Sequence, residues 1–531
     1  MRRFFTKRPA QAKEGGFIIP AALGLIIVIM IIAGATFTMV ESNLYVVNNN
    51  TNRQKAFNIA EAGVNYYLWH LSHSPNDYKD GRTGTVSEDP ELGFGPFEHN
   101  YVDDNQVTTG TYTLYIKPTS AGSTVAKVRS IGRVRGSEII RTIDAYIGAP
   151  SFASYGVVSD SALWFGNTET ASGPVHSNQG VRMDGASTAD VTSANTTYTP
   201  PASLGGNGSQ QPGVWCHTSV TSPVNCNTRS KTNWRYPVPS VDFNAISGNL
   251  CTIKRTAFAA NAATSTLANQ ANACSQTPTT RTSSYLPQRA TNGSYNRARG
   301  YLVQLNTNGT YDLYHVNGEN DLNSSYTSAL TLAAQGAGIA IPASGVIFAE
   351  DNVWVRSNPT YHGRVTIAAG RLATSSNANI TVADDLVYST KNGQDAIGLV
   401  AEGQISIAIY APPQNGSFNF QVHAAMIAQS GTVNYPNVYF SNTSRCSRGW
   451  INANQTFDFY GSVATRQQWT WTWQRNTSCS DAVQAAPGQY ISGVLNNNTQ
   501  YDYNLLYAPP PSFPITSSFN ILSWREVLTR P

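Results

Sequence analysis

Pairs of acidic residues are the groups in this sequence that could most directly carry out a reaction. Glu350-Asp351, Asp384-Asp385 and Glu402 all lie near the ends of short apolar stretches. Two carboxyl groups about 5–10 Å apart can cleave a glycosidic bond, one as acid and the other as base or nucleophile. Acidic residues in turns more often accept backbone N–H bonds, so we expect a protein that is not an enzyme. A polysaccharide-cleaving enzyme is the alternative.

Three tryptophans in residues 469–473, WTWTW, are a second candidate site. In a strand, Trp469, Trp471 and Trp473 point to one side at a spacing of about 6.5–7 Å, and could form a flat platform for sugar rings. The other possibility is that this side faces the core, the commoner fate of adjacent aromatic residues. Exposed aromatic clusters usually mark contact sites, so these indoles are a candidate platform for a surface glycan or a host-cell ligand.

Metal and cofactor chemistry has no motif in the sequence, and we expect neither. His176 and His423 have no second ligand at metal-binding spacing, which predicts hydrogen-bonded structural residues. No G-x-S-x-G, P-loop or H-E-x-x-H pattern occurs.

All six cysteines lie in the later part of the chain, which suggests disulfides formed in an oxidising compartment. Pairing of neighbours is the simplest of 15 connectivities, and free buried thiols are the alternative. The neighbour pairs are Cys216–Cys226, Cys251–Cys274 and Cys446–Cys479.

The element that must position everything else is the uncharged stretch of residues 17–40. At about 1.5 Å per residue it can cross a hydrocarbon layer of roughly 30 Å. Residues 1–16 carry five basic side chains and one acidic one, which predicts a cytoplasmic N-terminus and export of the rest. A secretory signal would have a shorter apolar core, whereas a plain membrane anchor also fits the length.

A helical pattern continues beyond this stretch. Phe57, Ala60, Val64, Leu68 and Leu71 recur every three or four residues, as on one face of a helix. Pro75 disfavours helix at the residue before it. We therefore expect one helix over residues 17–75, with its first part in the membrane and its second part carrying a folded domain.

Two short motifs carry a resemblance to a known family. Gly16-Phe17 stands at the inner edge of the apolar stretch, and residues 56–64 read AFNIAEAGV. Together they resemble a type IV prepilin, and the second is similar to the segment of PilX-type minor pilins and pseudopilins. The resemblance covers about the first 75 residues. It implies cleavage before Phe17 by a prepilin peptidase, methylation of the new amine, and partners that are other pilins and a pilus assembly platform. It also implies that the matching residues of the helix act in assembly: Ala21, Phe57, Ala60, Glu61, Ala62 and Gly63.

Ala21 departs from the major pilins of that family. It would be the fifth residue of the mature chain, where major pilins carry a glutamate. That glutamate is thought to pair with the N-terminal amine of a neighbouring subunit. The departure implies a minor subunit of a pilus or of a secretion pseudopilus. Such a subunit would lie at the tip of the filament or initiate its assembly.

The remaining chain reads as mainly β. Residues 111–117, 124–134 and 139–147 alternate in part, which predicts a small antiparallel sheet within residues 76–150. Four basic residues of this segment could share one face of the sheet: Lys127, Arg129, Arg133 and Arg135. We interpret this face as a solvated surface rather than a site of DNA capture. The net charge of +4 is largely that of residues 1–16, so no strong nucleic-acid signal remains.

Residues 151–514 contain short strands that recur about every 15–30 residues and favour a parallel β-helix (β-solenoid), with a β-sandwich as the alternative. Its core is expected to contain Val353, Val365, Ile367, Ile380, Val382, Leu399, Ile405, Ile427 and Val463. Residues 259–274 are the best isolated helix candidate of this part. Residues 515–531 are expected to form a C-terminal tail. The whole predicts a membrane protein that becomes an extracellular filament subunit and displays its β domain for adhesion.

Overall fold

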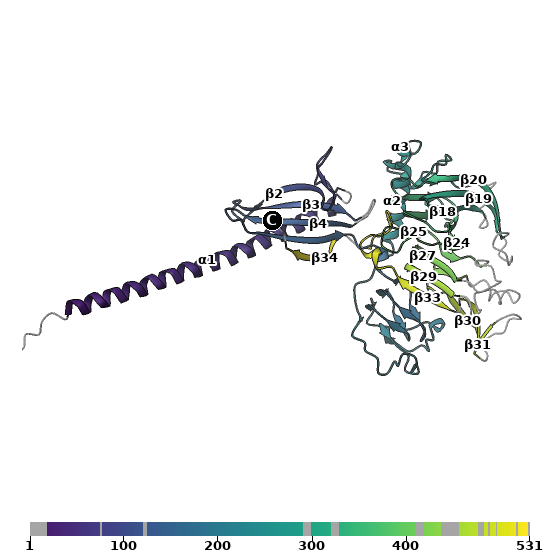
Figure 1. Cartoon of the computed structure of the whole chain (residues 1–531). Helices are drawn as coiled ribbons and strands as arrows, with labels where there is room; N and C mark the ends of the chain where they lie inside the picture. The colour runs from purple at the N-terminus through teal and green to yellow at the C-terminus, as the bar shows by residue number, and fades with distance from the viewer. Residues whose placement is uncertain are drawn as a thin grey trace, which may run out of the picture.

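The computed structural model is mainly β, with one long N-terminal helix and many sheets whose strand pairs are mostly parallel (Figure 1). It describes residues 18–74, 77–119, 125–289, 299–319, 329–409, 419–436, 456–475, 483–486, 489–494, 496–516 and 519–528. Gly16, Phe17, Cys446 and Cys479 lie outside these residues.

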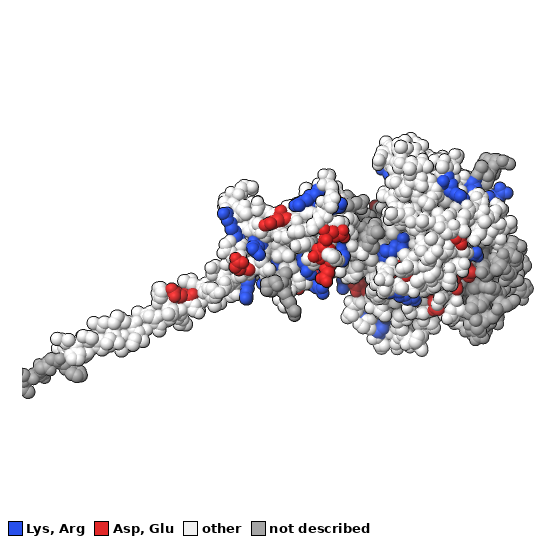
Figure 2. Space-filling model, turned by 45° about the horizontal axis from the view of Figure 1, so that its top comes forward, with Lys and Arg blue, Asp and Glu red and all other residues white. Residues whose placement is uncertain are grey.

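Helix α1 (Ile18–His73) is continuous over 56 residues, and confirms the single helix expected from the sequence. Its most apolar 18 residues have a mean hydropathy of 2.8, so it is long and apolar enough to cross a membrane. Residues 18–40 of the helix are exposed and contain no charged residue, so the visible face of this end of the rod is white in Figure 2. Its buried residues all lie between Ala56 and Leu71, where the helix meets a sheet.

The sheet against α1 has six antiparallel strands, which together with the second half of α1 we call the head. In spatial order the strands are β1 (Glu88–Asp89), β2 (Gly93–Val102), β3 (Thr108–Pro118), β4 (Val125–Val134), β5 (Ile140–Gly148) and β34 (Asn520–Val527). Alternate residues of β3 and β4 are buried, so one face of the sheet packs on the helix and the other faces solvent. The three strands expected from alternation are β3, β4 and β5.

Small residues let the helix approach this sheet closely. A Cβ atom at Gly132 on β4 would lie 2.2 Å from the backbone oxygen of Ala56. One at Gly63 on α1 would lie 2.9 Å from the ring of Tyr112. The glycine of the AEAG motif is therefore explained by packing within this chain.

Strand β34 comes from the far end of the chain and pairs with β5, beside which it lies in Figure 1. The sequence predicts a C-terminal tail over residues 515–531, whereas Asn520–Val527 of that range form a strand of the head. Everything between β5 and β34 is consequently an insertion into the head. Its two ends are joined, because Phe152 N donates to Pro514 O (3.0 Å) and Thr516 N donates to Pro150 O (2.7 Å).

The insertion contains an eleven-stranded sheet in which every pair of strands is parallel. In spatial order it runs β16 (Trp234–Arg235), β12 (Val191–Ser193), β9 (Val175–Ser177), β6 (Val157–Ser159), β29 (Thr456–Thr465), β27 (Asn419–Ala428), β25 (Ala396–Ala401), β23 (Arg364–Ala369), β21 (Val346–Ala349) and β17 (Tyr285–Leu286), with β33 (Asn497–Tyr501) also on β29. The pairing of β6 with β29 joins the start of the insertion to its end.

A seven-stranded sheet faces part of this one across a shared core. It runs β20 (Leu330–Ala340), β19 (Thr310–Glu319), β18 (Gly300–Asn306), β22 (Asn352–Asn358), β24 (Ile380–Val382), β26 (Ile405–Ile407) and β28 (Val433–Asn434). From β21 to β29 the chain alternates between the two sheets. Neither sheet closes on itself among the described residues. Of the nine core residues expected from the sequence, eight lie between the sheets, whereas Ile427 is buried on the outer face.

That outer face is covered by helix α2 (Ala245–Ala259) and by residues around Phe513. The helix expected over residues 259–274 is misplaced: α2 ends where it should begin, and only short helical turns follow, α3 (Ser265–Ala268) and the 3-10 helix η3 (Ala273–Ser275). The signal for α2 was the spacing of Ile246, Leu250, Ile253 and Ala257, all fully buried.

Small sheets complete the insertion. One is parallel, with β7 (Leu163–Phe165), β10 (Val181–Met183) and β15 (Val214–Trp215). Another is antiparallel, with β30 (Thr472–Arg475), β32 (Gln489–Gly493) and β31 (Val483–Ala486). Two pairs remain: β8 (Thr170–Ala171) with β11 (Ala186–Ser187), and β13 (Thr197–Tyr198) with β14 (Gln211–Pro212).

Candidate functional site

The assembly residues named by the resemblance fall into two groups along α1. Ala21 and Glu61 are exposed, and Ala21 lies in the apolar half. Ala60 and Gly63 are buried against the head sheet, and Phe57 and Ala62 are half-buried. Ala60 and Gly63 are therefore occupied within the chain, whereas Ala21 and Glu61 are accessible to neighbours.

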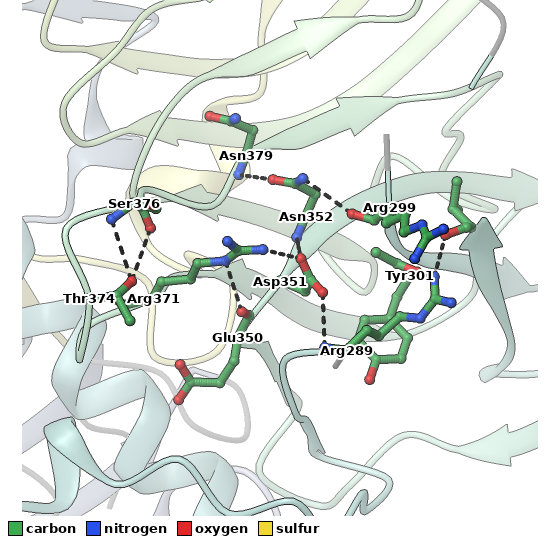
Figure 3. Close-up of polar contacts among 12 residues, drawn as sticks. Arg289, Arg299, Tyr301, Glu350, Asp351, Asn352, Arg371, Thr374, Ser376 and Asn379 are labelled. Atoms are coloured by element: carbon green, nitrogen blue, oxygen red, sulfur yellow. Dashed lines mark hydrogen bonds and ion pairs between the residues drawn. The ribbon is translucent and has the colours of Figure 1, made fainter. Parts of the chain in front are cut away.

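The Glu350-Asp351 pair lies in a buried ionic cluster at the turn between β21 and β22 (Figure 3). Glu350 pairs with Lys254 of α2, and the Tyr285 hydroxyl donates to Glu350 Oε1 (3.3 Å). Glu350 is 2% exposed and Lys254 is 0% exposed. A buried pair of this kind depends on both partners, because either charge alone would be uncompensated.

Asp351 is paired on the other side of the same turn. Its carboxylate contacts the Arg371 guanidinium and accepts hydrogen bonds from Asn352 N (2.9 Å) and Arg289 N (3.1 Å) (Figure 3). Arg371 Nε donates to Glu350 O (3.2 Å), and Arg371 N donates to Glu402 Oε2 (2.6 Å). The structure thus brings Glu350, Asp351 and Glu402 together around Arg371.

Burial dominates the electrostatics of this cluster. It raises the pKa of Glu350 and of Asp351, although Lys254 and Arg371 oppose the shifts. It also lowers the pKa of Lys254, against the attraction of Glu350. Because these side chains are enclosed and satisfy one another, they act as a structural clasp between α2 and the turns of the two sheets. We call this group, Lys254, Glu350, Asp351 and Arg371, the ionic clasp.

The Asp384-Asp385 pair lies apart from the clasp, after β24. Asp385 Oδ1 accepts from Gln421 N at the start of β27 (2.8 Å). Burial raises the pKa of Asp385 to about 6, and the charge of Asp384 adds to the shift. The contact to Gln421 gives this carboxyl a role in joining successive strands.

Both histidines are hydrogen-bonded within the protein, as the sequence predicts. His176 contacts Thr192 Oγ1 (2.9 Å) and Asn178 Oδ1 (3.0 Å). His423 Nδ1 accepts from Tyr388 N (3.0 Å), and burial lowers the pKa of His423 to about 3. His423 is therefore neutral over the physiological range.

Two disulfides join neighbouring cysteines, Cys216–Cys226 and Cys251–Cys274, in agreement with the simplest pairing. The third expected pair, Cys446–Cys479, lies outside the described residues. Asp184 lies beside Cys216 and Cys226, but their sulfurs are bonded to each other and offer no thiolate for a metal.

Trp469 and Trp471 do not form the expected open platform. They are 9% and 3% exposed and belong to the core between the sheets. Trp473 is half-buried, and its Nε1 donates to Tyr435 O (2.8 Å). The reason is packing: Trp471 contacts Phe457 and Phe459 of β29, and Trp469 contacts Phe165 of β7. All three indoles nevertheless line a cavity of about 260 Å³.

Trp164 also lines this cavity and is not among the residues expected from the sequence. The signal was its place in β7, because Leu163 and Phe165 are buried and Trp164 between them must face outward. Trp164 Nε1 donates to Asp184 Oδ2 (3.0 Å), and the Arg182 guanidinium lies 4.4 Å from the ring centroid. The indole is therefore fixed in orientation on the wall.

A second cavity, of about 580 Å³, adjoins the first at Glu169, which lines both. Glu169 Oε2 accepts from Gly166 N (2.7 Å), and its carboxylate also contacts Asn497. Burial raises the pKa of Glu169. The far part of the second cavity is lined by Tyr460 and Tyr503. We call the two cavities together the aromatic groove.

Comparisons with known proteins add one structural likeness. No protein-family model matches the chain, and no curated protein matches it. Among solved structures, the chain is similar to the competence-associated pilin ComZ from Thermus thermophilus, at 13% sequence identity and a TM-score of 0.27. That match covers 91% of this chain and 98% of ComZ. A TM-score of 0.27 does not establish a shared fold.

Proposed function

We propose that this chain is a membrane-inserted prepilin that becomes a minor subunit of a type IV pilus-like filament or secretion pseudopilus. The observation that carries the proposal is α1, which is uninterrupted from an exposed apolar half to a half docked on the head sheet. A basic leader ends in Gly16 immediately before this helix. Such a rod can leave the bilayer only if other apolar helices cover it, which is what filament assembly provides.

The insertion is the part that we propose to be displayed, at the filament tip, for surface contact. Support comes from β34, because the insertion leaves and re-enters the head at one edge of its sheet. A solenoid-like winding of the insertion is part of the proposal. It is supported by the regular alternation of the chain between two mostly parallel sheets from β21 to β29.

We propose no catalytic role for the acidic pairs. In the ionic clasp each carboxylate is enclosed and paired, which is the arrangement of a structural element. Asp385, with a pKa near 6, is the one candidate for the alternative, a membrane-anchored enzyme acting on polysaccharide. Loss of polysaccharide cleavage in an Asp384→Asn/Asp385→Asn variant that remains folded would support that alternative.

The N-terminus of the mature protein tests the proposal. Mass spectrometry of the protein from cells is expected to find Phe17 first, with a methylated amine, and to find the protein in sheared filaments. Gly16→Leu is expected to leave the leader attached and to remove the protein from filaments, while Gly15→Leu serves as the matched control. If a fully functional wild-type protein kept Met1, the filament proposal would be wrong. The chain would then be a surface protein tethered to the membrane.

A further inference from the structure

The aromatic groove presents an indole wall that is fixed before any ligand arrives. Trp164 is 37% exposed, although it lies between two buried neighbours on β7. Asp184 holds its N–H, and Arg182, which is buried, covers part of the ring. Asp184 is itself held by Arg182 Nε (2.8 Å) and by His217 N (2.9 Å). A rigid aromatic face loses little conformational entropy when a partner stacks on it.

The remaining lining of the groove combines aromatic side chains with polar groups that are almost all uncharged. Among the described residues that line the groove, Glu169 is the one with a carboxyl group, and none is Lys or Arg. The polar groups are hydroxyls and amides, including Thr470, Asn498 and Gln500. Two described cations contact aromatic residues of the groove. Arg182 lies over Trp164 and is paired with Asp184, and Lys391 Nζ lies 4.4 Å from the centroid of the Tyr460 ring.

These features select one chemical class of ligand. A polyanion such as nucleic acid requires several cations along its path, and the groove offers a carboxyl instead. A purely apolar ligand would make no use of the hydroxyls, amides and carboxyl that line the groove beside its indoles. Sugar rings have an apolar face that stacks on an indole and a rim of hydroxyls that bonds to carboxylates and amides.

We infer that the aromatic groove binds an uncharged oligosaccharide, with one sugar stacked on Trp164 and hydroxyls of the next bonded to Glu169. Tyr460 and Tyr503 provide a second aromatic contact at the far end of the groove. The inference deepens the display role proposed above by naming its ligand. Binding itself does not require leader cleavage or filaments, so either proposal can fail without the other.

Calorimetry on the purified full-length chain tests the inference, in a detergent whose headgroup contains no sugar. The probes are cellohexaose, chitohexaose and xylohexaose, each compared with single-stranded DNA. At least one hexasaccharide is expected to bind. Trp164→Ala should weaken that binding about tenfold or more, because the stacked contact is lost. Trp164→Phe should retain part of the affinity, and Glu169→Gln should weaken binding while keeping the bond from Gly166.

Trp524→Ala is the matched control, since Trp524 is also exposed but lies on β34 of the head. It should bind as the wild type does. Equal binding by Trp164→Ala and wild type would overturn the inference, as would the absence of binding by every hexasaccharide at millimolar concentration. Binding of DNA that Trp164→Ala abolishes would also overturn it and assign the groove to nucleic acid. A melting temperature equal to that of the wild type would show that a variant is folded, so that its loss of binding comes from the changed side chain.

Discussion

The head and the insertion bury their apolar residues in different ways. In the head, α1 covers one face of an antiparallel sheet, and buried residues alternate with exposed ones along β3 and β4. In the insertion, β21 and β25 are buried along their whole length. One side of these strands faces the seven-stranded sheet and the other faces α2.

The comparison shows where charge can reside in each region. A sheet with one wet face can place its ion pairs at the solvent boundary, as Asp144 does with Lys127 and Arg129. The sheet that is covered on both faces encloses some of its charged residues. The ionic clasp pairs such residues inside the protein, and burial raises the pKa of Asp385 to about 6. Exposed ion pairs, such as Arg235 with Asp190, occur in this region as well. The same residue types therefore stabilise the two regions by different means.

The ionic clasp should give the largest effect if one partner is removed. Lys254→Met leaves Glu350 buried without a cation and should destabilise the insertion by about 3–5 kcal/mol. The loss of stability can be measured by hydrogen exchange of the full chain, with peptides of the head and of the insertion followed separately. The head should exchange as in the wild type.

Two further variants make this prediction specific. Lys254→Met/Glu350→Met removes both charges and should recover most of the lost stability. Lys391→Met removes an exposed lysine of the same region and should change stability by less than about 0.5 kcal/mol. If the double variant were as unstable as Lys254→Met, lost packing rather than charge would explain the result.

Substitution of a glycine on β4 should cause the next largest loss of stability, and this loss should be confined to the head. Gly132→Ala forces a methyl group against the backbone of α1 and should destabilise the head by about 1–3 kcal/mol. Gly318→Ala on β19 is the matched change in the insertion, where the nearest atom to an added Cβ is 3.7 Å away. It should be neutral or slightly stabilising. The same exchange measurement reports both, and equal effects would contradict the close helix–sheet contact.

Acid should weaken the head through Asp144. Burial alone would raise the pKa of this carboxyl, but hydrogen bonds from Arg129 and Lys127 lower it below its usual range. Stability from this group is therefore present above about pH 4 and is lost as the pH falls through the lowered value. Asp144→Asn should cost about 1–2 kcal/mol at pH 7 and remove that part of the acid dependence. Hydrogen exchange of peptides from β4 and β5, at pH 7 and in acid, measures the stability of the head in both proteins. If the loss of stability in acid were the same for Asp144→Asn and the wild type, the prediction would be wrong.

The contribution of Asp385 to stability should change with pH in the opposite direction to that of Asp144. Its effect on stability should be the smallest of the four. Its folded-state pKa of about 6 lies above its unfolded value, so its contribution to stability falls as the pH rises from about 4 to 6. Asp385→Asn should raise the stability of the insertion at pH 7 by less than about 1 kcal/mol, since the residue is half-exposed. Thermal melting at pH 4.0 and 7.0 distinguishes the outcomes, and a loss of stability at pH 7 would contradict the burial effect.

Local patterns predicted those parts of the structure that depend on neighbouring residues. The stripe from Phe57 to Leu71 predicted the docked half of α1, and alternation predicted β3, β4 and β5. The spacing of Cys216 with Cys226 and of Cys251 with Cys274 predicted both described disulfides. The tryptophans were identified as a group, but their burial was not, because strand alternation cannot show what covers a face.

The sequence by itself determined an apolar rod, a helix that continues from it, and a long β-rich region. Each follows from composition or from a period of two to four residues, which is the range over which a chain dictates its own local structure. Only the tertiary structure decided that β34 belongs to the head, that Lys254 meets Glu350, and that Trp164 and Trp469 line one cavity. These residues are 96 to 385 positions apart in the sequence, and packing of the whole chain rather than local pattern brings them together.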